Sequence, residues 1–324
     1  MIERTTQGLL RRGHVVDLVV PKFGEPGRAE PFPLRRAGLP PFGRPVESRF
    51  TLSRLVDDAF ILLECLRQRP DVIVGHNVDG GMIAGLVGRA MSIPTVYVRH
   101  STFAREISIF THGSRLASSA AHLAERWVEN AAGTVIELAP SASGGDFWLP
   151  PPADLFEQTV EPGGGDTLYY EGNLDRVQNP GWLDAALCAA REVQPRARLV
   201  VARSPKERPD RADLALLPRS LPGGFPMKLL AYQLAGIPTV CVEEAVPGLI
   251  HGEDAFIVRG AGSAPLFAAS VREALADPEA RRRVRTRARA RAIRVHHPDR
   301  VAERLEWILE RASVAPPRTR PYIR

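Results

Sequence analysis

The sequence predicts an α/β fold of two Rossmann-like domains, the second with a reduced sheet. Short apolar runs alternate with segments of helical periodicity through both halves of the 324-residue chain, a pattern typical of parallel sheets covered by helices. Residues 141–166 are dense in proline, glycine and serine and predict a linker between two domains. The chain length agrees with this division.

The first domain is predicted to occupy residues 1–150. Its strands are expected at 15–20, 71–75, 94–98 and 134–138, and its helices at 2–12, 51–69, 79–91 and 114–130. Residues 21–46, which contain seven prolines, are expected to form a long loop.

The second domain is predicted over residues 160–300, followed by a terminal helix and tail over 301–324. Its strands are expected at 167–171, 197–202, 213–217, 238–242 and 254–258, and the helices at 181–193, 226–235, 264–276, 278–292 and 298–312. A crossover with its own helix needs at least ~10–12 residues before any further strand can form. The short polar segment between the strands at 197–202 and 213–217 therefore predicts the reduced sheet.

Residues 218–252 contain the most informative motif, a strand end followed by a glycine turn, a helix and a second strand. Pro226 suits the first helical turn, and Gly236 suits a left-handed C-cap. Loops that leave the carboxyl ends of strands form the ligand crevice of a doubly wound sheet, and a helix N-terminus there presents N–H groups to a phosphate. The order of elements therefore predicts a ligand site.

This motif resembles the donor-sugar site of retaining GT-B glycosyltransferases of family 4, also called group 1. The matching residues are Gly224, Phe225, Lys228, Leu229, Leu230, Tyr232, Ala235, Gly236 and Pro238. Further segments follow in the family's order at 11–16, 71–77, 93–100 and 169–174, so the resemblance covers most of the chain. It implies a GT-B fold whose C-terminal helix crosses back to the first domain.

Departures from the family's pattern indicate a shortened, divergent member. The positions of two glutamates, which hold the donor sugar and the ribose, are taken by Gly223 and Ala231. Neither can accept a hydrogen bond through its side chain. The usual first strand and glycine-rich loop have no counterpart, because residues 1–4 already have helical character. Either the gene is a shortened derivative or the sequence is incomplete at this end.

The resemblance implies a set of donor-binding residues in the second domain. They are Gly172, Asn173, Arg176, Gly224, Phe225 and Lys228. Retaining transfer needs positive charge and N–H donors that stabilise the departing nucleoside diphosphate. Two simpler interpretations stay open: Gly172 and Asn173 also suit a plain turn, and Lys228 also suits an exposed helix surface.

His100 is the implied catalytic residue, since the family has a histidine near the donor sugar at the end of this strand. A structural role for His100 is the alternative. His76, Asn77 and Asp79 end the preceding strand and, together with Glu106, are predicted on the acceptor side. No spacing of ligands suggests a metal, so neither a metal nor a cofactor is expected.

The charge of the chain leaves three interpretations open. The formal net charge is +6 and the arginines are concentrated at 281–291. A solvated helix face is favoured over nucleic-acid binding, because no aromatic residues interleave with the run. Contact with an anionic membrane surface is the third interpretation.

The compartment is predicted from cysteine usage and hydropathy. Cys65, Cys188 and Cys241 lie far apart and suggest no disulfide framework. No apolar stretch approaches the ~18–20 residues that cross a bilayer. We therefore expect a cytoplasmic protein, with peripheral contact at the inner membrane face as an open option.

The leading hypothesis is a glycosyltransferase of the hexosyltransferase type. It would move a sugar from a nucleotide-sugar donor, with retention, to a glycan, lipid or small-molecule acceptor. The alternative is a catalytically weak or inactive GT-B-like binding or partner subunit. A nucleic-acid partner is the least favoured hypothesis.

Overall fold

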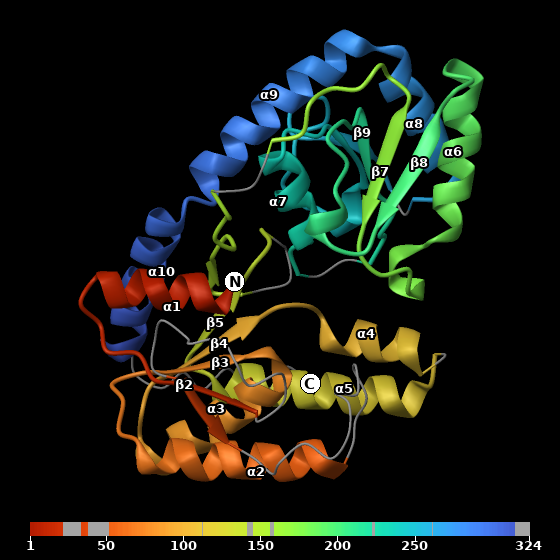
Figure 1. Ribbon diagram of the computed structural model, residues 1–324. Helices are drawn as coiled ribbons and strands as arrows, with labels where there is room; N and C mark the ends of the chain where they lie inside the picture. The colour runs from red at the N-terminus through yellow and green to blue at the C-terminus, as the bar shows by residue number, and fades with distance from the viewer. Residues whose placement is uncertain are drawn as a thin grey trace.

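The computed structural model describes residues 1–21, 34–37, 52–111, 113–140, 145–155, 159–221, 224–260 and 262–314. Two parallel sheets, each flanked by helices, lie one above the other in Figure 1. The linker region and the last helix connect them. This arrangement confirms the α/β class with two Rossmann-like sheets.

The first sheet is parallel and has the strand order β3-β4-β5-β6. Its strands are β3 (Ile73–His76), β4 (Thr95–Arg99), β5 (Thr134–Glu137) and β6 (Phe147–Trp148). The helices around it are α2 (Leu52–Arg67), α3 (Asn77–Met91), α4 (Phe103–Phe110) and α5 (Arg115–Ala131). The sequence does not predict α4 and β6, because both are too short to show a clear hydrophobic period.

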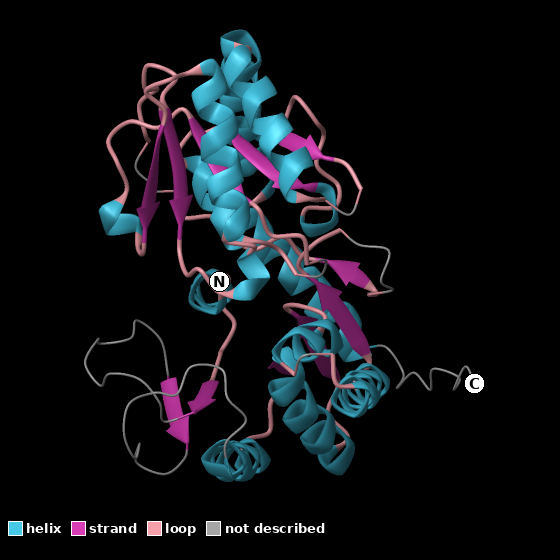
Figure 2. Cartoon of the chain, turned by 90° about the vertical axis from the view of Figure 1, so that its right-hand side faces the viewer, coloured by secondary structure: helices cyan, strands magenta, loops and turns pink. Residues whose placement is uncertain are grey.

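The first two strands form a separate small sheet. β1 (Leu18–Pro21) pairs in parallel with β2 (Leu34–Ala37), and neither pairs with another of the described strands. Figure 2 shows the pair apart from the four-stranded sheet, and β1 packs against α2. β2 lies inside the proline-rich segment that the sequence predicts as a loop, most of which falls outside the described residues.

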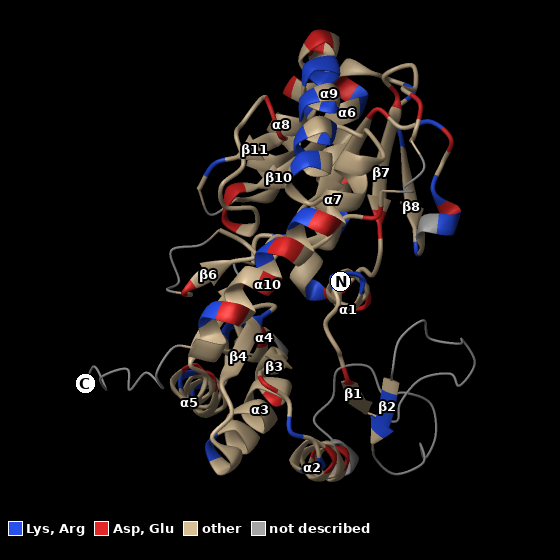
Figure 3. Cartoon of the chain, turned by 90° about the vertical axis from the view of Figure 1, so that its left-hand side faces the viewer, with Lys and Arg blue, Asp and Glu red and all other residues tan. Residues whose placement is uncertain are grey.

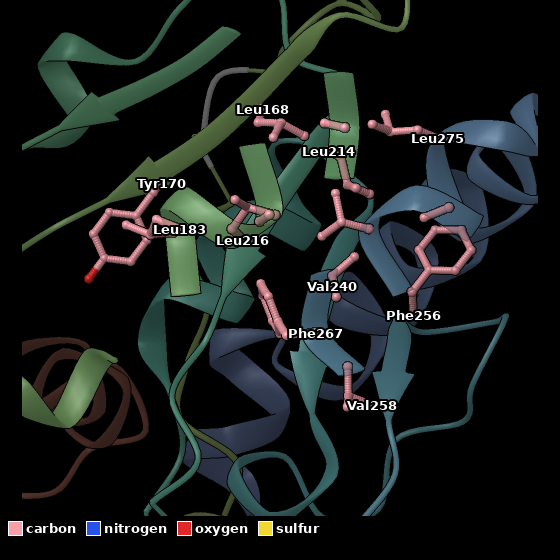
Figure 4. Close-up of a cluster of buried hydrophobic side chains, with 14 of the residues drawn as sticks. Leu168, Tyr170, Leu183, Leu214, Leu216, Val240, Phe256, Val258, Phe267 and Leu275 are labelled. Atoms are coloured by element: carbon pink, nitrogen blue, oxygen red, sulfur yellow. The ribbon is translucent and has the colours of Figure 1, made fainter. Parts of the chain in front are cut away.

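The second sheet is parallel and has the order β11-β10-β9-β7-β8. Its strands are β7 (Thr167–Glu171), β8 (Arg198–Ala202), β9 (Leu214–Leu217), β10 (Thr239–Val242) and β11 (Phe256–Val258). Its helices are α6 (Gly181–Val193), α7 (Met227–Leu234), α8 (Ala264–Ala276) and α9 (Pro278–Val295). Figure 4 shows part of its core, in which Leu214, Leu216, Val240 and Phe267 are fully buried.

The connection between β8 and β9 explains the reduced size of this sheet. β8 and β9 pair with opposite edges of β7, so the short segment between them passes across β7 and leaves β8 at the sheet edge. The Arg208 guanidinium in this segment donates to the Glu171 carboxylate at 3.0 Å, and both side chains are buried. Tyr169 donates to the same carboxylate at 2.6 Å. A buried ion pair thus anchors the connection.

The last helix, α10 (Pro298–Val314), packs against the first helix, α1 (Ile2–Arg11), as Figure 1 shows in blue and red. Gly8 lies at the contact, where a Cβ would come within 2.5 Å of the Ala302 Cβ. At the corner between α9 and α10, His296 hydrogen-bonds the Pro151 carbonyl at 2.7 Å. The end of the chain is therefore fixed both to α1 and to the segment between the sheets.

Replacing Gly8 with valine is expected to lower the free energy of unfolding by about 1–3 kcal/mol, because the added side chain overlaps Ala302 in a packed helix contact. Urea denaturation measures the change. Gly164→Val is the matched control, since a Cβ at Gly164 meets nothing within 4 Å. Equal losses in the two variants would contradict close packing of α1 on α10.

Candidate functional site

The two domains meet near the carboxyl ends of β4 and β7. His100 follows β4, and its carbonyl oxygen would lie 1.9 Å from a Cβ on Gly224, just before α7. Gly224 has a φ of 72°, a conformation that glycine adopts without a steric penalty. Candidate residues of both domains are therefore brought together at this backbone contact.

His76 and His100 form a hydrogen-bonded pair at the ends of neighbouring strands. Nδ1 of His76 lies 2.9 Å from Nε2 of His100, and the two rings meet edge to face with centroids 5.2 Å apart. Burial lowers the pKa of His76 to about 3, with a smaller contribution from His100, and lowers the pKa of His100 to about 4. Both rings are neutral at pH 7, so one donates and the other accepts.

The other acceptor-side candidates lie on the helices that follow these strands. Asn77 begins α3 with a φ of 59° and is exposed, and Asp79 lies in the first turn of the same helix. Glu106 is half-buried in α4. Its negative charge opposes the lowering of the pKa of Arg219 in the second domain by burial.

Lys228 lies against the turn that ends β7. Its Nζ donates to the Tyr170 hydroxyl at 3.0 Å and to Gln178 Oε1 at 3.3 Å, and it lies 4.6 Å from the centre of the Tyr170 ring. Gly172 has a φ of 112°, and a Cβ there would come within 2.7 Å of this Nζ. Tyr170 in turn donates to the Asn173 carbonyl. The structure thus brings together Gly172, Asn173 and Lys228.

Arg219 is a cation at this site that the sequence analysis missed. It follows β9 and is half-buried. Burial lowers its pKa, while the charges of Glu106 and Asp175 oppose this effect. Burial also lowers the pKa of Lys228 to about 8, where Asp175 opposes the shift and Arg219 adds to it. The sequence signal for Arg219 was its position two residues after a predicted strand, at the same sheet edge as Gly172.

Two of the predicted donor residues have other surroundings than Lys228. Arg176 is exposed at the start of a short 3-10 turn. The Phe225 ring packs against His296, with centroids 5.0 Å apart, and borders core clusters of both domains. Phe225 therefore fills the boundary between the domains. Gly223 lies outside the described residues, and Ala231 is half-buried on α7.

In the described part of the chain, no group of three histidine, cysteine, aspartate or glutamate residues is arranged to hold a metal ion. Lys228 and Arg219 carry positive charges that could neutralise a bound anion near the domain boundary. The contribution of each predicted site residue to ligand binding stays a prediction.

Comparisons with known proteins identify the fold of the chain. Residues 1–142 match a family described as a glycosyl transferase 4-like domain, and a search of curated proteins finds no match. Sucrose-phosphate synthase from Thermosynechococcus elongatus is similar in structure, with a TM-score of 0.73 and 15% identity over 96% of this chain and 92% of that chain.

Two further solved structures are similar over most of their length. HepE from Anabaena, in complex with UDP and glucose, has a TM-score of 0.63 and 15% identity over 86% of each chain. WaaG, a glycosyltransferase involved in lipopolysaccharide biosynthesis, has a TM-score of 0.62 and 15% identity over 93% of this chain and 94% of that one. The chain therefore has the GT-B fold that its sequence predicts.

Protonation of the histidine pair is expected to destabilise the fold in acid. Both pKa values lie below the value of about 6.5 for an exposed histidine, so the unfolded chain binds more protons than the folded one between about pH 6.5 and pH 4. As the pH is lowered through this window, the free energy of unfolding should decrease by up to about 1.4 kcal/mol per pH unit for each histidine.

Urea denaturation at several pH values measures this dependence. The double variant His76→Asn with His100→Gln lacks both titrating rings and should show a shallower slope between the same pH limits. Identical slopes in wild type and double variant would show that the two rings are accessible to protons in the folded state.

Proposed function

We propose that the chain is a glycosyltransferase that binds a nucleotide sugar and transfers its sugar to an acceptor with retention of configuration. The observation that carries the proposal is the position of Lys228, held against the Gly172 turn by Tyr170 and Gln178. This basic group lies at the boundary of two Rossmann-like domains, where His100 of the first domain meets Gly224 of the second. Such a boundary at the carboxyl ends of parallel strands is where α/β folds bind nucleotides.

The chemistry of the leaving group supports this assignment. A departing nucleoside diphosphate develops negative charge, which preorganised cations and N–H donors stabilise. Lys228 and Arg219 provide positive charge, and the N-terminus of α7 provides backbone N–H groups. Because these groups can neutralise the diphosphate directly, we propose a reaction that needs no metal or cofactor.

The neutral histidine pair suits a hydrogen-bonding role. With its pKa lowered to about 4, His100 does not carry a positive charge at pH 7. A neutral imidazole can still orient a donor-sugar hydroxyl by accepting or donating one hydrogen bond. The known ligands of the similar structure HepE, UDP and glucose, support a nucleotide sugar as the donor. We propose a glycan, a lipid or a small molecule as the acceptor.

Calorimetric titration with UDP and with GDP tests the binding half of the proposal, and a donor-hydrolysis assay with nucleotide sugars tests the chemistry. Binding of one nucleotide together with slow hydrolysis of its sugar conjugate is the expected result. Binding without hydrolysis would leave a GT-B-like binding subunit as the function. No affinity for either nucleotide would overturn the proposal.

Lys228→Met is expected to weaken UDP binding by about 1–3 kcal/mol, because a charge-assisted hydrogen bond is lost. The affinity of the wild-type protein should also fall as pH rises through about 8, where the free Lys228 loses its proton. The variant should lack this fall, because methionine does not titrate.

Titrations on either side of this pH measure both effects. Lys206→Met is the matched control, since Lys206 is exposed in the connection after β8. Unchanged affinity in Lys228→Met, or an equal loss in the control, would remove Lys228 from the site.

Ala231→Glu is expected to raise the rate of transfer. Position 231 is half-buried on α7, where a carboxylate could accept hydrogen bonds from the donor. An unpaired buried hydroxyl costs about 1–3 kcal/mol, so one restored partner corresponds to roughly one to two orders of magnitude in rate. Ala231→Gln controls for side-chain size without charge. Ordinary turnover by the unmodified chain would show that other groups replace the missing carboxylates.

A further inference from the structure

The arginine run of α9 is mostly occupied by contacts within the protein. Arg281, Arg285 and Arg289 donate to the carbonyls of Ala274, Val160 and Leu234, at 2.8, 3.0 and 2.9 Å, while Arg287 and Arg291 pair with Glu253 and Asp254. These arginines therefore tie α9 to the second domain. The exposed arginines that remain on α9 include Arg282 and Arg283.

A different basic surface runs along α10, which we call the arginine–tryptophan stripe. It consists of Arg300, Arg304, Trp307, Arg311 and Val314, which are all exposed. Their spacing of three and four residues places them on one face of the helix. Trp307 and Val314 are 41% and 81% exposed, so the stripe carries apolar as well as basic groups.

The acidic residues of α10 occupy the neighbouring face, and the end of α1 with the residues after it engages two of them. Asp299 pairs with Arg11 at 3.1 Å, and Glu306 pairs with Arg12 and lies 2.7 Å from a ring nitrogen of His14. Among the described residues, no carboxylate forms an ion pair with any of the three stripe arginines. Figure 3 shows the basic and acidic segments alternating along α10.

Aromatic rings hold two of these arginines in position. The Arg304 guanidinium lies 5.7 Å from the centre of the Trp148 ring, and its Nε donates to the Trp148 carbonyl at 2.6 Å. The Arg311 guanidinium lies 4.2 Å from the centre of the Trp307 ring. A guanidinium has five N–H donors, so donors remain available for a ligand.

The stripe leads into a groove of about 440 Å³ at the corner between α9 and α10. Arg294, Arg300 and Arg304 line it together with Trp148, and Glu303 is the one carboxylate in its lining. The Arg300 guanidinium donates to the Arg294 backbone carbonyl at 3.2 Å, which holds the Arg300 side chain at the end of α9. The groove thus offers three guanidinium groups and an indole ring to one anionic group.

We propose that the arginine–tryptophan stripe and this groove dock the protein on an anionic membrane surface, with a lipid phosphate in the groove. Guanidinium groups bind phosphate through paired hydrogen bonds. Tryptophan rings are favoured at the level of lipid headgroups, with basic side chains beside them. The described chain contains no helix that could span a bilayer. The exposed Trp307 and Val314 favour a membrane over a nucleic acid, because both can enter the apolar boundary of the bilayer.

Flotation with vesicles tests the proposal. The wild-type protein should float with vesicles of phosphatidylcholine mixed with phosphatidylglycerol and should stay behind with phosphatidylcholine alone. Each basic residue near the surface adds on the order of a fivefold gain in partition, so Arg300→Gln with Arg304→Gln should reduce binding by at least about tenfold. Arg282→Gln with Arg283→Gln removes the same charge from the exposed side of α9 and should change binding far less.

Tryptophan emission gives an independent readout. Adding the anionic vesicles should shift the emission to shorter wavelength, and Trp307→Phe should reduce this shift while circular dichroism and UDP titration stay unchanged. Equal losses in the two arginine double variants, or no flotation of the wild type, would overturn the proposal. If inorganic phosphate displaced the vesicles at an equal concentration of phosphate, the groove would be a site for free phosphate. If duplex DNA bound more tightly than the vesicles, the stripe would be a nucleic-acid surface. Either result would also overturn the proposal.

Discussion

The backbone contact between Gly224 and His100 is the constraint on which the candidate site depends. Any side chain at Gly224 would meet the His100 carbonyl oxygen at 1.9 Å, so the approach of the two domains is possible only for glycine. The next residue, Phe225, fills the boundary between both cores, and Lys228 follows in the first turn of α7. A shift of this contact would therefore move Lys228, together with the second domain, relative to His100 of the first.

Strand β7 links the stability of the second domain to its site. All of its residues are buried, and successive side chains serve opposite faces of the sheet. Tyr170 supports Lys228 from one face. Glu171 accepts from Tyr169 and Arg208, and its backbone N–H donates to the Tyr232 hydroxyl of α7 at 2.8 Å. The same strand thus anchors the short connection after β8 and the helix that carries Lys228.

Much of the fold could be predicted from the sequence because its strands and helices are marked by strong apolar periodicity. The exceptions, α4, β2 and β6, are short segments whose structure is set by their neighbours. The histidine pair could not be predicted, because it depends on register. His76 pairs with Val98 across β3 and β4, and the period of two then places His100 on the same face. Arg219 was missed although it closely follows a predicted strand, because its proximity to Glu106 of the other domain depends on tertiary structure.

The distribution of charge around each helix, and not the net charge, decides whether its arginines form contacts within the protein or stay available to a partner. The arginines of α9 face carbonyls and carboxylates of their own domain, so they contribute to packing. On α10 the acidic face is turned to α1, which brings arginines and a histidine to it. Residues 11–14 engage Asp299 and Glu306, and no described carboxylate forms an ion pair with the arginines of the neighbouring face. Those arginines therefore keep their charge for solvent or a partner. The return of the last helix to the first one therefore leaves the arginines of the arginine–tryptophan stripe without an ion-pair partner among the described residues.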